Sequence, residues 1–183
     1  MRSGLPAVLD VTGRRCVVVG AGSAGRRKVD ALLAAGAEVA VIDPTGIDPT
    51  GGPSTPSVEV IDRSWQPGDL SGAHLVVVAT DRPEVNDAVA AEAEAVGALV
   101  LRSDRSGDGH LTLPAVAHRA SVRVAVDTGG DSPAVAAVIR DEIDRFLDVE
   151  GDRWDELARW AAERRPASVA EVEARLAELR GSA

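Results

Sequence analysis

Along the first hundred residues, continuous apolar runs alternate with segments whose apolar positions recur every three or four residues. A short apolar run between turn residues is typical of a buried parallel strand, and the wider spacing is typical of an amphipathic helix. This pattern predicts strands over 15–19, 38–42, 58–63, 74–80 and 97–103, with helices over 23–35 and 82–96. Strands and helices that alternate in this way indicate an α/β sheet with helices on its faces.

After residue 103 the pattern becomes less regular. The chain is expected to continue as a polar loop over 103–110, an alternating strand over 122–127, a helix after Ser132, and two short helices over 152–164 and 168–180. The Ser132 hydroxyl suits an N-cap because its oxygen accepts from a free backbone N–H group, and Pro133 fits the first helical position. Asp81 and Ser168 are predicted to cap the helices that follow them.

Composition and charge narrow the class of protein. Among the 183 residues, 45% are hydrophobic and 27% are charged, which is ordinary for a globular protein with its own core. We expect no transmembrane helix, because no apolar run approaches the roughly 20 residues that a membrane span needs. We also expect no signal peptide, because the apolar part of the N-terminal segment MRSGLPAVLDVTG is too short. The single cysteine excludes an internal disulfide and favours a cytoplasmic location. The net charge of −9 argues against non-specific nucleic-acid binding.

Three glycines after the first predicted strand carry the first chemical signal. Gly20, Gly22 and Gly25 have the GxGxxG spacing of a dinucleotide-binding turn. The first glycine permits the tight turn, the second lets the backbone approach a pyrophosphate, and the third lets helix and strand pack closely. Ser23 and Ala24 begin the helix, whose N-terminus offers backbone N–H groups to the phosphates.

Asp43 and Pro44 follow the second predicted strand. A carboxylate at this position suits hydrogen bonds to the adenosine ribose hydroxyls and repels a 2′-phosphate, so the sequence favours NAD over NADP. Asp43 also suits an ordinary turn before proline. The alternatives to a dinucleotide site are an S-adenosylmethionine site, a sensor domain and a purely structural turn.

A second group of polar residues follows the strand predicted over 74–80. Ligands of open α/β sheets bind beyond the carboxyl ends of the strands, so we expect these residues beside the cofactor. They are Thr80, Asp81 and Asn86. Helix capping explains Asp81 equally well.

Three longer stretches then follow one another along the chain. They are LPAVLDVTGRRCVVVGAGSAGRRKVDALLAAGAEVAVIDP, VVVATDRPEVNDAVAAEAEAVGALVLRSD and LPAVAHRASVRVAVDTGGDSPAVAAVIRDEI. Together, from about Leu5 to about Leu147, they resemble the N-terminal family of siroheme synthases, the precorrin-2 dehydrogenases. The resemblance implies NAD-dependent oxidation of precorrin-2 to sirohydrochlorin, and some members of that family also insert iron.

The resemblance also implies that Asp104, just after the fifth predicted strand, is the catalytic residue. Oxidation of a reduced tetrapyrrole needs hydride transfer to NAD and loss of a proton, which a carboxylate near the nicotinamide can accept as a general base. In metal-inserting members the same group would accept pyrrole protons. The chain departs from the family pattern at Leu101, where Asn is common, and at Thr128, which is often Ser. A loop or capping role for Asp104 stays open.

The substrate class carries many carboxylates, so its binding to an acidic chain must use local donors. Cationic side chains and a glycine turn before a helix N-terminus offer such donors. The substrate-binding candidates are Arg102, Arg105, Thr128, Gly129, Gly130 and Ser132. His110 is expected to be a solvated loop residue, and no metal ligand is predicted.

The sequence therefore predicts an α/β protein in three parts. We expect a Rossmann-type NAD-binding domain over 1–113, a small dimerisation segment of strand and helix over 114–148, and a C-terminal helical segment over 149–183 that closes over the substrate. The resemblance implies that the second part joins two subunits in a homodimer. A dinucleotide-sensing module without turnover is the alternative function. A methyltransferase fits less well, because Val17–Val19 stand where an acidic residue would precede the glycines.

Overall fold

The chain is described from a computed structural model over residues 4–46, 58–105, 107–119, 121–129, 132–166 and 168–181. It divides into two compact units, Arg2–Thr112 and Leu113–Ala183. None of the helices in these described ranges has the length and apolarity that crossing a membrane requires. Most of the loop predicted over 44–57 lies outside the described residues.

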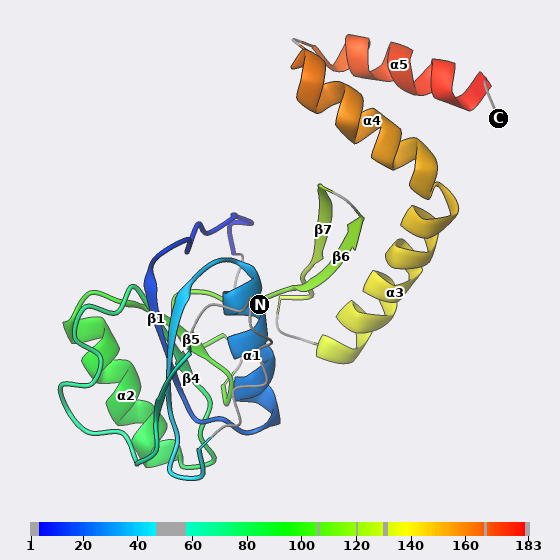
Figure 1. The fold of residues 1–183 in the computed structure, drawn as a ribbon. Coiled ribbons are helices and arrows are strands. Elements are labelled where there is room, and N and C mark those ends of the chain that lie inside the picture. The colour runs from blue at the N-terminus through cyan, green and yellow to red at the C-terminus, as the bar shows by residue number, and fades with distance from the viewer. Residues whose placement is uncertain are drawn as a thin grey trace. The chain divides into compact units, whose positions relative to one another are not determined.

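The first unit is a five-stranded parallel sheet with helices on both faces (Figure 1). Its strands, in the spatial order β3-β2-β1-β4-β5, are β1 (Arg15–Val19), β2 (Glu38–Ile42), β3 (Glu59–Ile61), β4 (Leu75–Val78) and β5 (Leu99–Arg102). The helices are α1 (Ser23–Ala34) and α2 (Pro83–Ala95). The α/β sheet and every element that the sequence predicts here are confirmed, with ends shifted by a few residues.

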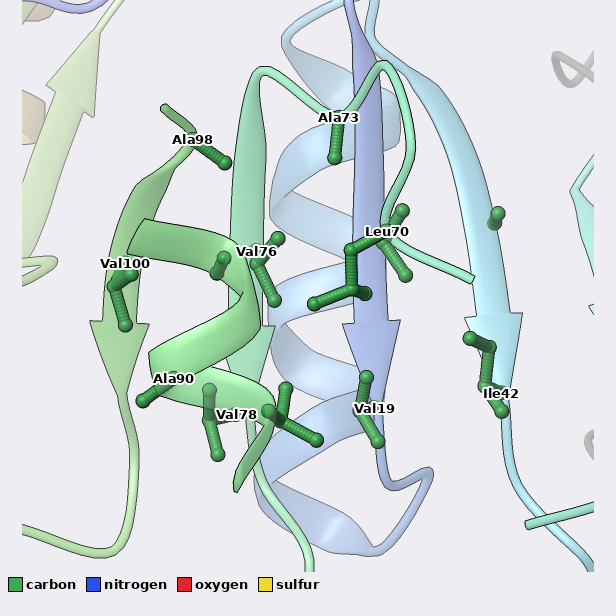
Figure 2. Packing of buried hydrophobic residues seen from close by; sticks show 13 residues of the cluster. Val19, Ile42, Leu70, Ala73, Val76, Val78, Ala90, Ala98 and Val100 are labelled. Atoms are coloured by element: carbon green, nitrogen blue, oxygen red, sulfur yellow. The ribbon is translucent and has the colours of Figure 1, made fainter. Parts of the chain in front are cut away.

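The core of this unit lies in two layers, one on each face of the sheet. Val17 and Val19 of β1 point to one layer and pack with residues of α2 (Figure 2). Cys16 and Val18 point to the other layer and pack with residues of α1. Because both faces are covered, the central strands are apolar at consecutive positions, Cys16–Val19 and Leu75–Val78, rather than at every second one. Burial raises the pKa of the Cys16 thiol to about 11, so Cys16 is a core residue and not a nucleophile.

The start of α2 corrects one prediction. Arg82, not Asp81, occupies the N-cap position, and its side chain makes no capping hydrogen bond. Pro83 stands at the first helical position and biases the residue before it toward an extended conformation, which Arg82 adopts. The Asp81 side chain is therefore one residue too far from the helix to cap it.

The second unit contains a two-stranded antiparallel sheet and three helices within its described residues. The strands are β6 (Ala115–Arg119) and β7 (Val122–Val126), and the helices are α3 (Pro133–Val149), α4 (Gly151–Arg164) and α5 (Val169–Gly181). The predicted strand and helices are confirmed, whereas β6 was not predicted. The caps are confirmed too: the Ser132 hydroxyl accepts from the Val135 N–H group and the Ser168 hydroxyl from the Glu171 N–H group, both at 3.3 Å.

Candidate functional site

The carboxyl ends of four neighbouring strands gather the predicted site residues of the first unit at one edge of the sheet. Gly20 follows β1, Asp43 follows β2, Thr80 lies just beyond β4, and Asp104 lies just beyond β5. The last residues of β1, β2, β4 and β5 are paired in register, so these positions leave the sheet at the same level. Parallel sheets bind their ligands at this edge.

The three glycines of the turn have different structural reasons. Gly20 has a φ of +99°, and a Cβ there would lie 2.6 Å from the Ala79 carbonyl carbon. A Cβ on Gly25 would overlap the carbonyl oxygen of Gly20. Beside Gly22, in contrast, a Cβ would meet no atom of the described chain within 4 Å. The fold therefore requires Gly20 and Gly25, whereas the open space beside Gly22 fits the approach of a ligand.

The N-terminus of α1 borders this open space. Gly22 is the N-cap, and Ser23 and Ala24 are the first helical residues. Within the described chain, α1 has no side-chain cap and no acidic residue in its first turn. Its first N–H groups are thus available to an anion, as a bound pyrophosphate requires.

Asp43 connects the end of β2 to the glycine turn. One carboxylate oxygen accepts from the Ala21 N–H group at 2.6 Å, and the other accepts from the N–H and hydroxyl groups of Thr45 at 2.8 and 2.5 Å. Partial burial opposes ionisation, but the hydrogen bonds from Thr45 and Ala21 outweigh it and hold the Asp43 pKa below its usual range. The side chain is therefore a carboxylate at neutral pH, which suits a ribose hydroxyl. Pro44 follows it and is exposed.

Asn86 of α2 is buried, with only 1% of its surface exposed, and it joins two other candidates. Its Oδ1 accepts from the Thr80 hydroxyl at 2.6 Å, and its Nδ2 donates to the Thr80 carbonyl at 3.0 Å. Asn86 also makes a side-chain hydrogen bond with Asp104. The structure thus places Asn86 behind Thr80 and Asp104 rather than on the surface. Asp81 is exposed at the start of the same segment.

Asp104 belongs to a cluster of four charged side chains. Arg102 donates to both of its carboxylate oxygens, from Nε at 3.0 Å and from Nη2 at 2.7 Å. A third Arg102 bond, from Nη1, reaches Asp87 of α2 at 2.7 Å, and Arg105 donates to the same Asp87 oxygen at 3.1 Å. We call these four residues the Arg102 cluster. Arg102 is its innermost member, with 7% of its side chain exposed, against 19% for Asp104.

The cluster fixes the protonation state of Asp104. The hydrogen bonds from Arg102 lower its pKa from the ordinary 3.8 to about 2; partial burial opposes this shift, and the bond from Asn86 adds to it. Asp104 is therefore an ionised carboxylate at neutral pH, with both oxygens paired to one guanidinium.

Two partners at this edge were not predicted from the sequence. Asp87 lies one position after the predicted Asn86, and Thr45 lies two positions after Asp43. An Asp-x-Thr turn is a recognisable signal for the Thr45 bonds, because aspartate side chains commonly accept from the backbone two residues on. Nothing in the spacing distinguishes Asp87 from the other acidic residues of α2.

The remaining substrate candidates lie in the second unit, at the N-terminus of α3. The Thr128 hydroxyl donates to the Ser132 carbonyl at 3.1 Å and accepts from the Ser132 N–H group at 3.3 Å. Gly129 has a φ of +66°, a left-handed conformation that glycine adopts without strain. Gly130 lies outside the described residues. The described part of this segment is thus a turn that presents the start of a helix.

His110 is bonded rather than merely solvated. The imidazole Nδ1 accepts from the backbone N–H group of Val100 at 3.1 Å, and the backbone N–H group of His110 donates to the Val100 carbonyl at 2.8 Å. The loop after Asp104 therefore folds back along β5 and pairs the outer edge of the sheet. Over the described ranges, no group of three His, Cys, Asp or Glu side chains is arranged to hold a metal ion.

Comparison with known proteins shows what this chain is similar to. The sequence model of a family described as "Putative NAD(P)-binding" matches residues 7–115. A siroheme synthase from Methylobacillus flagellatus is 36% identical over 165 residues, which are 89% of this chain and 34% of that protein. A siroheme synthase from Chromobacterium violaceum is 36% identical over 143 residues, 78% of this chain and 30% of that protein. The chain thus spans about a third of the length of these relatives.

A solved structure described as "SirC, precorrin-2 dehydrogenase" has the same fold. It aligns with a TM-score of 0.68 at 22% sequence identity, and the alignment covers 96% of this chain and 89% of that one. The sheet, the small antiparallel pair and the C-terminal helices thus form a fold already known in another protein.

Proposed function

We propose that this chain, which belongs to the NAD(P)-binding family, is an NAD-dependent dehydrogenase that oxidises precorrin-2 to sirohydrochlorin. The observation that carries the proposal is the carboxyl edge of the sheet, where the open space beside Gly22, the Asp43 carboxylate and the Asp104 carboxylate follow neighbouring strands. The names of the similar proteins, siroheme synthase and precorrin-2 dehydrogenase, support this substrate. They do not support the alternative of a sensing module without turnover.

NAD fits the residues present at this edge. The backbone at Gly22, Ser23 and Ala24 would hold the pyrophosphate, since a Cβ at Gly22 would enter the space that the phosphates need. A carboxylate has about four lone-pair positions, and the described partners of Asp43 use three of them. One position is left for a ribose hydroxyl, and the negative charge would repel the 2′-phosphate of NADP. When bound, NAD supplies the hydride acceptor.

Asp104 is proposed as the general base. Oxidation of precorrin-2 removes one hydride, which passes to NAD, and one proton, which the Asp104 carboxylate accepts. Asn86 orients this carboxylate from behind and holds Thr80 with the same amide. We propose that Arg102 and Arg105 bind carboxylates of the substrate. The same role is proposed for a segment of the second unit, with Thr128, Gly129, Gly130 and Ser132.

A homodimer is part of the same proposal. One face of α3 carries large apolar side chains that are each at least 41% exposed: Val135, Val138, Ile139, Phe146 and Val149. Their spacing puts them on a single stripe of the helix, which is the pattern of a face that packs against another element. A second copy of this chain would bury the stripe, and monomers rarely leave such a surface in water.

We also propose the cytoplasm as the location.

The direct test is turnover. The protein is incubated with precorrin-2 and NAD without oxygen, and the absorption spectrum and NADH formation are followed. We expect sirohydrochlorin to form. Asp104→Asn keeps the shape and removes the proton acceptor, so its rate should fall by about 10²–10⁴ while NAD affinity is nearly unchanged. A parallel reaction of the product with ferrous iron tests metal insertion.

The matched control is Asp108→Asn, which makes the same change in the same loop, where Asp108 is exposed. If the wild-type protein binds NAD but does not consume precorrin-2, the dehydrogenase function is rejected and a sensing module is favoured. If Asp104→Asn keeps full activity, Asp104 is not the general base. If this variant loses NAD binding together with activity, Asp104 supports the cofactor pocket instead.

A further inference from the structure

Arg102 is held in a way that restricts what can replace its partners. Every hydrogen bond described for its guanidinium goes to a carboxylate: two to Asp104 and one to Asp87. Only 7% of the Arg102 side chain is exposed while these carboxylates cover it. A buried guanidinium that loses a bidentate partner needs another anion of the same planar geometry, and a carboxylate of a ligand has that geometry.

The position of Asp104 in the cluster conflicts with a role as base. A general base works best when its pKa lies near the pH of the reaction, and the Asp104 pKa is about 2 while Arg102 holds it. Both carboxylate oxygens also have Arg102 as partner, so the lone pairs that would accept a proton are partly occupied. The bidentate pair with Arg102 therefore shields Asp104.

We propose that Arg102 is a positioning residue that keeps Asp104 shielded until a carboxylate group of the substrate takes its place on the Arg102 guanidinium and releases it. The proposal rests on the dehydrogenase function above and assigns a regulatory step to the same site. Asp87 makes the exchange local. Because Arg102 Nη1 stays bonded to Asp87, only the edge formed by Nε and Nη2 has to change partner.

The charges of the cluster favour release. Arg102 and Arg105 carry two positive charges, and Asp87 and Asp104 carry two negative charges, so the cluster is neutral as observed. A substrate carboxylate adds one negative charge, and an excess negative charge favours the protonated form of the nearest carboxylate. Substrate binding would thus raise the pKa of Asp104 and strengthen it as a base at the moment when the base is needed.

Two side-chain groups act on Asp104 directly: the Arg102 guanidinium from β5 and the neutral amide of Asn86 from α2. Asp87 of α2 belongs to the same cluster through its bond to Arg102, and Arg105 of the loop after β5 belongs to it through its bond to Asp87. Among the described residues, no histidine belongs to this set of partners. A rise of the Asp104 midpoint when the ligand binds is therefore the sign of the exchange on Arg102.

The experiment follows the Asp104 carboxyl carbon by NMR in the full-length protein, as pH is lowered, with and without sirohydrochlorin. Without it, Asp104 should stay ionised down to the lowest pH at which the protein remains folded. With sirohydrochlorin, which carries the carboxylates but has already lost its hydride, the midpoint should move above 3.8. In Arg102→Leu the midpoint should lie near or above 3.8 in both states, so the effect of the ligand should be lost.

Kinetics supply a second measurement. Arg102→Leu should raise KM about tenfold or more, because one charge-assisted contact with the substrate is lost. Arg102→Lys keeps the charge but not the bidentate geometry, and should fall between Arg102→Leu and wild type in both KM and the NMR midpoint. Arg63→Leu is the matched control: Arg63 makes a bidentate pair with Asp69 at 2.7 and 2.8 Å, outside the Arg102 cluster. It should leave both readouts unchanged.

The outcomes separate the two proposals. If the wild-type protein oxidises precorrin-2 but sirohydrochlorin does not move the Asp104 midpoint, the proposed exchange on Arg102 is wrong and the proposed dehydrogenase function stands. The same holds if Arg102→Leu folds and keeps the wild-type KM. If the wild type does not oxidise precorrin-2, the dehydrogenase fails. If Arg102→Leu does not fold, the wild-type titrations and Arg102→Lys still decide.

Discussion

Two glycines of the same turn should respond in opposite ways to the same added methyl group. Gly22→Ala places a Cβ where no described atom lies within 4 Å, in backbone angles of φ −61° and ψ −178° that alanine adopts freely. Gly25→Ala places a Cβ onto the carbonyl oxygen of Gly20. We therefore expect the first variant to lose NAD affinity without losing stability, and the second to lose stability.

The magnitudes follow from these surroundings. At Gly22, the lower entropy of the unfolded chain favours alanine by about 0.4–1 kcal/mol, and the poorer N-cap opposes this by a similar amount. The Tm should then change by about 2 °C or less. At Gly25, overpacking costs about 1–3 kcal/mol, and we expect the upper end because the overlapped atom belongs to the backbone. That corresponds to a fall in Tm of about 6–12 °C.

Thermal unfolding without ligand and calorimetric titration with NAD measure the two effects separately. For Gly22→Ala, the Kd for NAD should rise at least about tenfold, which is about 1.4 kcal/mol. If this variant binds NAD as tightly as the wild type, the space beside Gly22 is not the pyrophosphate site. If its Tm falls as far as that of Gly25→Ala, the glycine is structural and the reasoning from open space is wrong.

Three further predictions concern other parts of the molecule. Asp43→Asn should weaken NAD binding and narrow the preference over NADP, by on the order of 1–3 kcal/mol, when both cofactors are titrated; an unchanged preference would contradict the ribose role. The wild type should sediment as a dimer at micromolar concentration, and Val138→Glu should shift it toward monomer while Val169→Glu, exposed on α5, should not; a wild-type monomer would reject the homodimer. The Asp104 pKa of about 2 lies below the ordinary 3.8, so its stabilisation is complete above about pH 4 and is lost as pH falls to about 2. Asp104→Asn should accordingly lower the free energy of unfolding by on the order of 1–2 kcal/mol at pH 7, after allowance for solvent screening, and by nearly nothing at pH 2. Denaturant unfolding at both pH values measures this difference, and an equal effect at the two pH values would refute the assignment.

The first unit could be predicted from the sequence because its strands are buried on both faces. Uninterrupted apolar runs such as 16–19 therefore stand out, and turn or polar residues such as Gly20 and Asp43 mark where they end. Strand β6 could not be predicted in this way. Its sequence AVAHR ends in two polar residues, and it is a strand because it pairs with β7, which is a tertiary effect.

Some residues of the candidate site could likewise be predicted from the sequence, and others could not. Gly20, Asp43 and Asp104 could be predicted to lie along one edge of the sheet, since the carboxyl ends of parallel strands share that edge. The bond between Arg102 and Asp87 could not, because it depends on how a helix side chain is directed toward the end of a neighbouring strand. Spacing along the chain does not contain that direction.

The buried amide of Asn86 has a consequence for how this sequence can change over time. Its Nδ2 donates to the Thr80 carbonyl, its oxygen accepts from the Thr80 hydroxyl, and its side-chain hydrogen bond with Asp104 helps to lower the pKa of that carboxylate. No other side chain of similar size offers two donors and an acceptor at once. A substitution at one of these three positions leaves a polar group of another without its partner, so Thr80, Asn86 and Asp104 are expected to vary together across related sequences.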